Sequence, residues 1–228
     1  ATAVTNAPPL VFLGSPQVSA DVLSALVAAG HDIKLVVTGP DRRRGRGGAT
    51  SPTPVGARAQ ELGLPVSHFA ADAASCGAEL GVVVAYGEII RPSVLEQISM
   101  VNIHFSLLPR WRGAAPVERA ILAGDVETGA CVMEVVEALD AGGVYASAAL
   151  PLSSEIDAAT LTAELGVVGT ELLLQCLEDG LGDPDPQVGE ITYATKITSD
   201  DRHIDWSERN DEILRRVRIG GAGTTWRG

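Results

Sequence analysis

Apolar residues in this chain recur with two different periods, and the alternation between them predicts a series of strands and helices. A short apolar run, Leu10 to Leu13, stops at Gly14, as a buried strand does before a tight turn. From Val18 to Ala29 apolar positions recur every three or four residues, which predicts a helix that ends at Gly30. Ile33 to Val37 is the next strand. A strand, a helix and a strand in this order predict a βαβ unit with parallel strands.

The same reading continues along the rest of the chain and predicts an α/β fold. Gly81 to Tyr86 is apolar on both faces, which indicates a central, fully buried strand. Val144 to Leu152 is expected to pair back on the preceding strand as an antiparallel hairpin. Other strands are predicted at 65–66, 101–105, 128–136 and 191–197, and helices at 55–62, 92–98, 116–123, 158–177 and after an N-cap at Ser207. We therefore expect a Rossmann-like, mostly parallel sheet with helices on both faces and an antiparallel C-terminal hairpin.

Charge is distributed unevenly. The formal net charge of −12 argues against nonspecific binding of nucleic acid by the domain as a whole. The stretch 39–54, however, is rich in glycine and proline, is predicted to be a loop without regular structure, and concentrates Arg42, Arg43, Arg44 and Arg46. Two interpretations stay open: a solvated run of charge, or a cationic arm that contacts phosphates.

Several classes of function are disfavoured by what the chain lacks. The turn at Gly14-Ser15-Pro16 lacks the later glycines of a dinucleotide-binding loop. The four histidines show no metal-ligand spacing, and no cysteine pair supports zinc, so no metal site is expected. No apolar run approaches the roughly 20 residues needed to span a bilayer, and the N-terminus has no signal-peptide pattern. Three cysteines without a C-x-x-C motif indicate free thiols, and together these features predict a cytoplasmic protein with no membrane contact.

Candidate chemistry concentrates at the end of the strand 101–105. Asn102 and His104 alternate with apolar residues, so their side chains share one face at the carboxyl end of the strand, where α/β proteins bind ligands. Asp140 lies in the glycine-bearing turn L-D-A-G-G, which can bend its carboxylate toward a neighbouring strand end. Taken singly, a strand histidine is more often structural and an aspartate beside glycine more often a turn former. Together they suit acyl transfer. An amide can stabilise an oxyanion, an imidazole can move a proton, and a carboxylate can raise the imidazole pKa and select its tautomer.

The motifs of the chain strongly resemble those of the methionyl-tRNA formyltransferases, which use 10-formyltetrahydrofolate. The likeness begins after Pro9 and rests on V-F-L-G-S-P, G-P-D-R-R-R-G-R-G, V-V-V-A-Y-G, V-N-I-H-F-S-L-L-P-R-W-R-G-A-A-P, L-D-A-G and K-I-T-S-D-D-R-H-I-D-W. It implies a catalytic domain over 10–207, preceded by a flexible lead-in at 1–9. Residues 208–228 would then form a helix and the start of a linker to a basic C-terminal β-barrel domain that is not in this chain.

The resemblance also implies roles for individual residues. Asn102, His104 and Asp140 would carry catalysis. The residues expected beside the folate co-substrate are Ala85, Tyr86, Gly87, Ser106, Leu107, Leu108, Pro109, Ala141 and Gly142. Arg42, Arg43, Arg44 and Arg46 would approach the acceptor end of charged initiator tRNA, and the enzyme is expected to be a monomer without a metal. Two alternatives are a formyltransferase that acts on a sugar-nucleotide or other small amine, and a folate-binding module without turnover.

Overall fold

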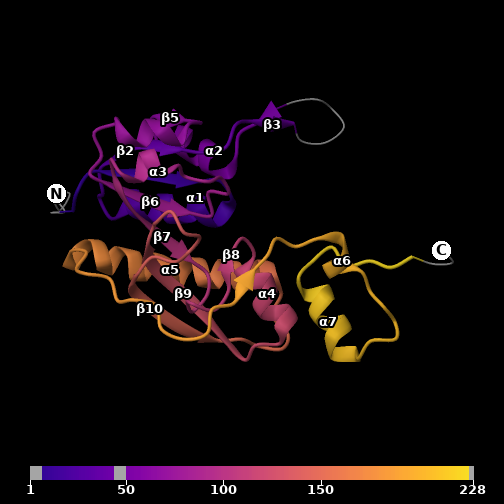
Figure 1. Ribbon diagram of the computed structural model, residues 1–228. Helices are drawn as coiled ribbons and strands as arrows, with labels where there is room; N and C mark the ends of the chain where they lie inside the picture. Colours follow the sequence, from indigo (N-terminus) through magenta and orange to yellow (C-terminus); the bar gives the residue numbers. More distant parts are fainter. Residues whose placement is uncertain (1–6, 44–49, 226–228) are drawn as a thin grey trace.

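The computed structural model describes residues 7–43 and 50–225, which form a seven-stranded sheet covered by helices (Figure 1). The strand order is β10-β9-β7-β6-β1-β2-β5. Pairing is parallel from β5 to β7 and antiparallel between β9 and β10, as the sequence predicted. Strand β9 also pairs antiparallel with β7, which the sequence did not predict. The strands are β1 Leu10–Gly14, β2 Ile33–Val37, β5 Val66–Ser67, β6 Leu80–Val84, β7 Ser99–His104, β9 Glu127–Glu134 and β10 Val144–Pro151.

Helices cover both faces of the sheet, because side chains along each central strand alternate between two cores. Leu10 and Phe12 of β1 enter the larger core, whereas Val11 and Leu13 enter the smaller one on the opposite face. Four helices cover the larger core: α1 Gln17–Ala28, α2 Pro54–Glu61, α4 Pro116–Ala123 and α5 Ala158–Asp179. The smaller core lies under the 3₁₀ turn η1 Ala70–Ala74 and the short helix α3 Pro92–Leu95. The predicted doubly covered α/β architecture is confirmed.

Helix α5 corrects one expectation. Its 22 residues make it long and apolar enough, by length and composition alone, to cross a membrane. In the structure it lies along β7, β9 and β10 (Figure 1), and its Leu161, Leu165 and Leu173 are fully buried in the larger core. The expectation that no segment approaches a membrane-spanning length was wrong, because a helix buried on one side of a sheet can carry the same composition.

The arginine-rich stretch contains regular structure, although its sequence predicts a loop without any. Strand β3 (Arg42–Arg43) pairs antiparallel with β4 (Thr50–Ser51) and projects beyond the carboxyl edge of the sheet (Figure 1). The glycines that argued against regular structure cluster between the two strands, so the flanking residues are free to adopt extended backbone. Arg44 and Arg46 lie outside the described residues.

The C-terminal segment forms a separate two-stranded sheet with β8 (Arg112–Gly113) and then packs on α4. Strand β11 (Tyr193–Ala194) pairs in parallel with β8. Two helices follow, α6 Ser199–Arg202 and α7 Asn210–Arg218. Arg119 of α4 binds Asp201 with its two Nη atoms, at 2.7 and 2.9 Å, and this hydrogen-bonded pair lowers the pKa of the carboxyl to about 2. These contacts fasten α6 to the main body.

One expectation about this segment was wrong, and one helix was not predicted. Helix α6 was not foreseen, although Thr198 and Asp201 form a capping box at its start. Arg209, not Ser207, occupies the N-cap of α7. The hydroxyl of Ser207 instead donates to Asp205 Oδ1 at 2.7 Å, so it closes a local turn before the helix begins.

Candidate functional site

Strand β7 places an amide and an imidazole at the carboxyl edge of the sheet. Val101 and Ile103 enter the larger core, and the period of two therefore directs Asn102 and His104 to the opposite face. His104 is the last residue of the strand and is 5% exposed. The predicted pairing of these two side chains on one face is confirmed.

The imidazole of His104 is oriented by a backbone carbonyl. Its Nε2 lies 2.8 Å from the carbonyl oxygen of Trp111. Because a carbonyl can only accept a hydrogen bond, Nε2 must carry the proton, and in the neutral ring Nδ1 keeps its lone pair. Trp111 itself is held in a left-handed conformation (φ 64°). Its N–H donates to Thr192 Oγ1 at 2.9 Å, its indole donates to Asp125 at 2.7 Å, and Arg110 lies 4.4 Å above the ring.

Burial decides the protonation state of His104. The pKa of the imidazole is lowered because burial disfavours the charged ring, and this outweighs the opposing effects of Asp140 and the Trp111 carbonyl. Asp140 Oδ2 lies 3.7 Å from Nδ1, too far for a hydrogen bond. Asp140 does raise the pKa of the imidazole, as expected, but burial outweighs this effect. The expectation that Asp140 selects the tautomer was wrong, because the Trp111 carbonyl selects it.

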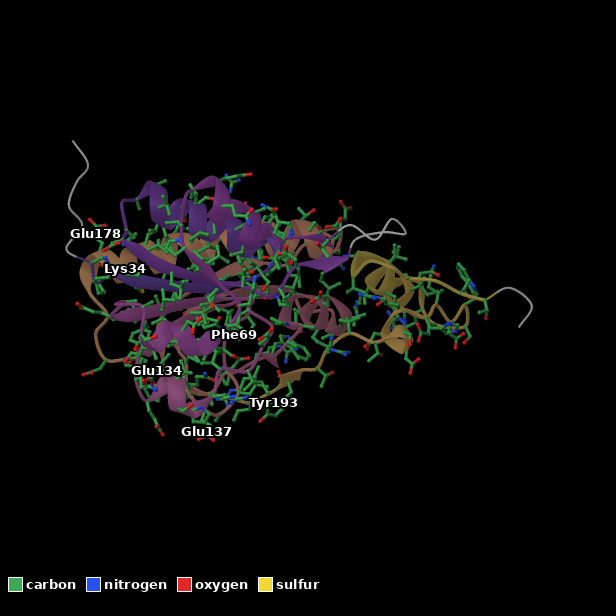
Figure 2. The ribbon with its side chains drawn as sticks, turned by 90° about the horizontal axis from the view of Figure 1, so that it is seen from above. Lys34, Phe69, Glu134, Glu137, Glu178 and Tyr193 are labelled. Carbon is green, nitrogen blue, oxygen red and sulfur yellow. The ribbon has the colours of Figure 1, made fainter. Side chains whose placement is uncertain are left out.

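Asp140 is held beside the imidazole by the backbone of β8. The carboxylate accepts a hydrogen bond from the N–H of Gly113 at 2.7 Å. Gly113 has a φ of 123°, and a Cβ atom there would lie 2.7 Å from the carbonyl oxygen of Ala194. Only glycine fits this position, which lets the backbone N–H approach the carboxylate. Figure 2 labels Glu134, at the end of β9, and Glu137, in the turn that leads to Asp140; in that view both lie on the same side of the molecule as Tyr193 of β11.

Asn102 presents an amide that is free of hydrogen bonds within the described part of the chain. The side chain is half-buried, and none of the described residues makes a hydrogen bond with it. The amide can therefore donate to a bound oxygen atom without first breaking an internal contact.

The site holds no activated nucleophile of its own. The hydroxyl of Ser106 donates to the carbonyl of Arg110 at 2.6 Å, and the thiol of Cys131 donates to the carbonyl of Ser106 at 3.0 Å. Burial raises the pKa of the Cys131 thiol to about 11, so it is not a thiolate at neutral pH. Among the described residues, this arrangement suits direct transfer of an acyl group between two bound molecules and not a covalent acyl-enzyme.

The residues expected beside the folate form two groups at the same edge of the sheet. Ala85, Tyr86 and Gly87 follow β6 in a turn with positive φ at Ala85 (44°) and Gly87 (80°). The Tyr86 ring is buried in the smaller core, its hydroxyl donates to Glu88, and burial followed by Glu88 raises its pKa to about 12. Any ligand contact from this turn is thus expected to come from its backbone.

The second group joins the loop after β7 to the turn that carries Asp140. Leu108 and Pro109 are linked by a cis peptide. A Cβ at Gly142 would lie 2.0 Å from the carbonyl oxygen of Glu134, so the turn requires glycine there. Leu107 and Leu108 line a cavity of about 320 Å³ together with Cys131, part of β10 and residues 185–188. None of Asn102, His104 and Asp140 lines it, so this cavity lies beside the candidate site and not in it.

Sequence reasoning missed three groups that hold the site together: the Trp111 carbonyl, the Gly113 N–H and the side chain of Gln187. The first two lie in R-W-R-G, one of the motifs that carry the resemblance. Gln187 lies in a proline- and aspartate-rich stretch and donates to the carbonyls of Asp140 and Gly142, both at 2.8 Å. No periodic pattern marks any of them. Among the residues that the structure describes, no group of three or more potential ligands for a metal occurs.

Comparison with known proteins identifies the family of the chain. Residues 9–177 match the model of the formyl transferase family. Methionyl-tRNA formyltransferases from Dinoroseobacter shibae and Clavibacter sepedonicus are 45% and 42% identical to the chain. Each alignment covers 92% of the chain and 74% or 72% of the relative, respectively.

Solved structures share the fold at lower identity. HypX from Aquifex aeolicus, in complex with tetrahydrofolic acid, has a TM-score of 0.74 at 20% identity, over 96% of this chain and 36% of HypX. An N-formyltransferase from Helicobacter canadensis, in complex with folinic acid and dTDP-3-aminofucose, has a TM-score of 0.72 at 17% identity, over 92% of this chain and 79% of that one. These structures share the fold, whereas the family model and the sequence relatives establish that the chain belongs to the formyl transferase family and, within it, to the methionyl-tRNA formyltransferases.

Proposed function

We propose that the chain transfers a formyl group from 10-formyltetrahydrofolate to the amino group of methionine on charged initiator tRNA. The relatives that share 41–45% of its sequence carry the name of this activity. The observation that carries the mechanism is the buried, neutral His104, with Nε2 occupied by Trp111 and Nδ1 left to face Asp140. Such a group can accept one proton and return it.

The reaction then proceeds by direct attack. The amine nitrogen bonds to the formyl carbon, and the carbonyl oxygen becomes an oxyanion that the amide of Asn102 stabilises by donating a hydrogen bond. Nδ1 of His104 takes a proton from the attacking nitrogen. The bond between the formyl carbon and the folate nitrogen breaks, and His104 returns the proton to that nitrogen. The products are the formylated amine and tetrahydrofolate, and the imidazole is again neutral.

Asp140 supports the charged intermediate of this cycle. While His104 holds the transferred proton, the imidazolium is stabilised by the carboxylate 3.7 Å from Nδ1. In the resting enzyme the same carboxylate is held by the Gly113 N–H, so it need not move when the charge appears. Asp140 thus acts on the intermediate more than on the free enzyme, which is how a preorganised charge accelerates a reaction.

The protonation state of His104 predicts the pH dependence of the reaction. Since burial lowers the pKa of His104, the neutral base should persist below pH 6.5 and be lost only as the pH falls through the lowered value. We expect the acid limb of kcat/KM to lie below 6.5. Asp140 opposes the lowering, so Asp140→Asn should move that limb further down and reduce the rate. The pH profile of kcat/KM for both proteins, corrected for the ionisation of the substrate amine, measures this; an acid limb of the enzyme above 6.5 would contradict the assignment.

We further propose that the folate lies between the two turns at the carboxyl edge of the sheet. Ala85, Tyr86 and Gly87 would form one wall, Ser106, Leu107, Leu108 and Pro109 the second, and Ala141 and Gly142 the third. The internal hydrogen bonds of Tyr86 and Ser106 leave backbone N–H and C=O groups as the polar contacts. The complex of HypX with tetrahydrofolic acid, a protein of the same fold, supports a folate ligand here.

The tRNA would approach along the arm formed by β3 and β4. Arg42 and Arg43 lie on this arm, which leaves the same carboxyl edge as the candidate site (Figure 1), and Arg44 and Arg46 follow outside the described residues. In a chain of net charge −12, this concentration of arginine supports local contact with phosphates. The substrate implies a cytoplasmic reaction, and the monomeric state remains a prediction.

Replacing Arg42, Arg43, Arg44 and Arg46 together by alanine should weaken the use of charged tRNA. The slope of log kcat/KM against log salt concentration should also become shallower, by about 0.7–0.9 for each phosphate contact that is lost. The measurement is formyl transfer at several salt concentrations. Arg209→Ala is the matched control, because this arginine lies on α7, where it pairs with Asp211, and should leave the slope unchanged.

One assay tests the proposed function as a whole. The protein is incubated with 10-formyltetrahydrofolate and charged initiator tRNA, and the esterified amino acid is analysed for formylmethionine. Transfer to a nucleotide-sugar amine with none to tRNA would instead favour the alternative acceptor. Binding of folate without transfer to either amine would favour a non-catalytic module.

A further inference from the structure

The turn that carries Asp140 needs an external support. It connects β9 to β10 across residues 135–143, and Asp140 has a φ of 46°. Left-handed backbone is less favourable for aspartate than for glycine, although aspartate adopts it more readily than most residues, and surrounding contacts help to hold it. The hydrogen bond from Gly113 holds only the carboxylate of Asp140 and leaves the backbone of the turn to other contacts.

The side chain of Gln187 provides that support. Its Nε2 donates to the carbonyl oxygens of Asp140 and Gly142, both at 2.8 Å. Its Oε1 accepts two hydrogen bonds from the guanidinium of Arg112, from Nε at 3.0 Å and from Nη2 at 2.6 Å. The amide thus uses both donors and both acceptor sites, and only this orientation matches carbonyls on one side and a guanidinium on the other.

These contacts join the two elements that define the position of Asp140. One is the turn itself; the other is β8, where Arg112 precedes the Gly113 whose N–H binds the Asp140 carboxylate. Gln187 lies 47 residues from Asp140 in the sequence and 75 from Arg112, so it belongs to neither element. A single side chain thereby holds the backbone of Asp140 and the strand that binds its carboxylate in one arrangement.

We propose that Gln187 is a positioning residue for the transfer reaction, which keeps the Asp140 carboxylate beside Nδ1 of His104. The role rests on the proposed function, since it acts through the groups assigned to catalysis there. Without Gln187 the turn loses two hydrogen bonds, and β8 loses the link to the turn that runs through the side chain of Arg112. Asp140 can then relax toward ordinary backbone, and its carboxylate can move away from the imidazole.

This role predicts a change at His104, which Gln187 does not touch. Loss of the nearby carboxylate should lower the pKa of His104, because Asp140 is the larger of the two effects that oppose burial, the other being the Trp111 carbonyl. Two other groups need consideration. Cys131 on β9, opposite His104, has a pKa near 11 and stays neutral through this range. Arg112 on β8 is present in every variant of the comparison.

The test compares Gln187→Met, which preserves length and removes all four hydrogen bonds, with the wild-type protein and with Asp140→Asn. The pKa of His104 is followed by NMR titration, with the signal assigned from His104→Gln. We expect Gln187→Met and Asp140→Asn to lower this pKa in the same direction. A wild-type value in Gln187→Met, alongside a lowered value in Asp140→Asn, would overturn the proposal.

Transfer kinetics provide the second readout. Gln187→Met should reduce kcat by about tenfold or more with little change in KM, and the double variant with Asp140→Asn should be no slower than Asp140→Asn alone. Additive losses, or a kcat within twofold of wild type, would refute the role. Gln187→Glu keeps a partner for Arg112 but cannot donate to the carbonyls, so it should also lose kcat.

A control variant and the NMR titration separate failure of the Gln187 role from failure of the proposed function. Gln97→Met is the matched control, since Gln97 also donates to a backbone carbonyl, that of Ser93, but on the exposed surface after α3; it should match wild type. The NMR titration needs no acceptor. If the wild-type protein fails to formylate charged tRNA, the proposed function fails, while the titration still decides whether Gln187 positions Asp140.

Discussion

Replacing His104 by glutamine should reduce kcat/KM for formyl transfer by about 10²–10⁴-fold, the usual effect of removing a general base. Glutamine can still donate a hydrogen bond to the Trp111 carbonyl, so the loop after β7 should keep its conformation. It cannot accept a proton at neutral pH. The loss should therefore come from proton transfer and not from misfolding, and thermal unfolding should change little.

The measurement is initial-rate formylation of charged tRNA, with a matched histidine as control. His68 also has a ring nitrogen 2.9 Å from a backbone carbonyl, that of Thr38, but it is exposed and on another part of the chain. His68→Gln should keep activity near that of wild type. Activity of His104→Gln within a few-fold of wild type would rule out the proposed role of the imidazole.

Replacing Asn102 by alanine should reduce kcat by about 10²–10³-fold, the range for loss of one oxyanion donor. KM should change little, because the negative charge on the carbonyl oxygen exists only in the transition state and the tetrahedral intermediate. No internal hydrogen bond is lost in this variant, since the amide makes none with the described residues. Stability should stay close to that of wild type.

Single-turnover rates with saturating substrates measure this effect on the chemical step. Asn210→Ala, at the start of α7, removes an amide far along the chain and should leave the rate unchanged. A rise in KM at constant kcat would instead assign Asn102 to substrate binding. Asn102→Asp should be at least as slow as the alanine variant, because a carboxylate would repel the oxyanion.

The parts of the fold that the sequence predicted are those that depend on neighbouring residues. Alternation of Val101 and Ile103 with Asn102 and His104 determines which side chains share a face, whatever the strand packs against. The helix 116–123 and the strand 33–37 were predicted with the bounds that α4 and β2 have. Short elements were harder. The β3–β4 pair and α6 consist of two to four residues per element, too few for a period to be visible.

The sequence predicted which residues form the candidate site more completely than it predicted their protonation states and hydrogen bonds. The sequence brought together Asn102, His104 and Asp140, and the structure places the last two 3.7 Å apart. The sequence could not show that burial outweighs the effect of the carboxylate on the pKa of His104, because desolvation depends on how fully the folded protein encloses the ring. It also could not identify Trp111 as the hydrogen-bond partner, since that contact requires the loop after β7 to turn back on the strand.

Sequence alone therefore determined the α/β layout, the shared face of the amide and the imidazole, and the likeness to a formyltransferase. Each of these follows from local periodicity or from contiguous motifs. Only the tertiary structure decided the tautomer and lowered pKa of His104, the glycine-dependent contact between Gly113 and Asp140, and the link made by Gln187. The reason is physical: these properties come from hydrogen bonds and desolvation between segments distant in the chain, and such segments meet only once the sheet and its loops have folded.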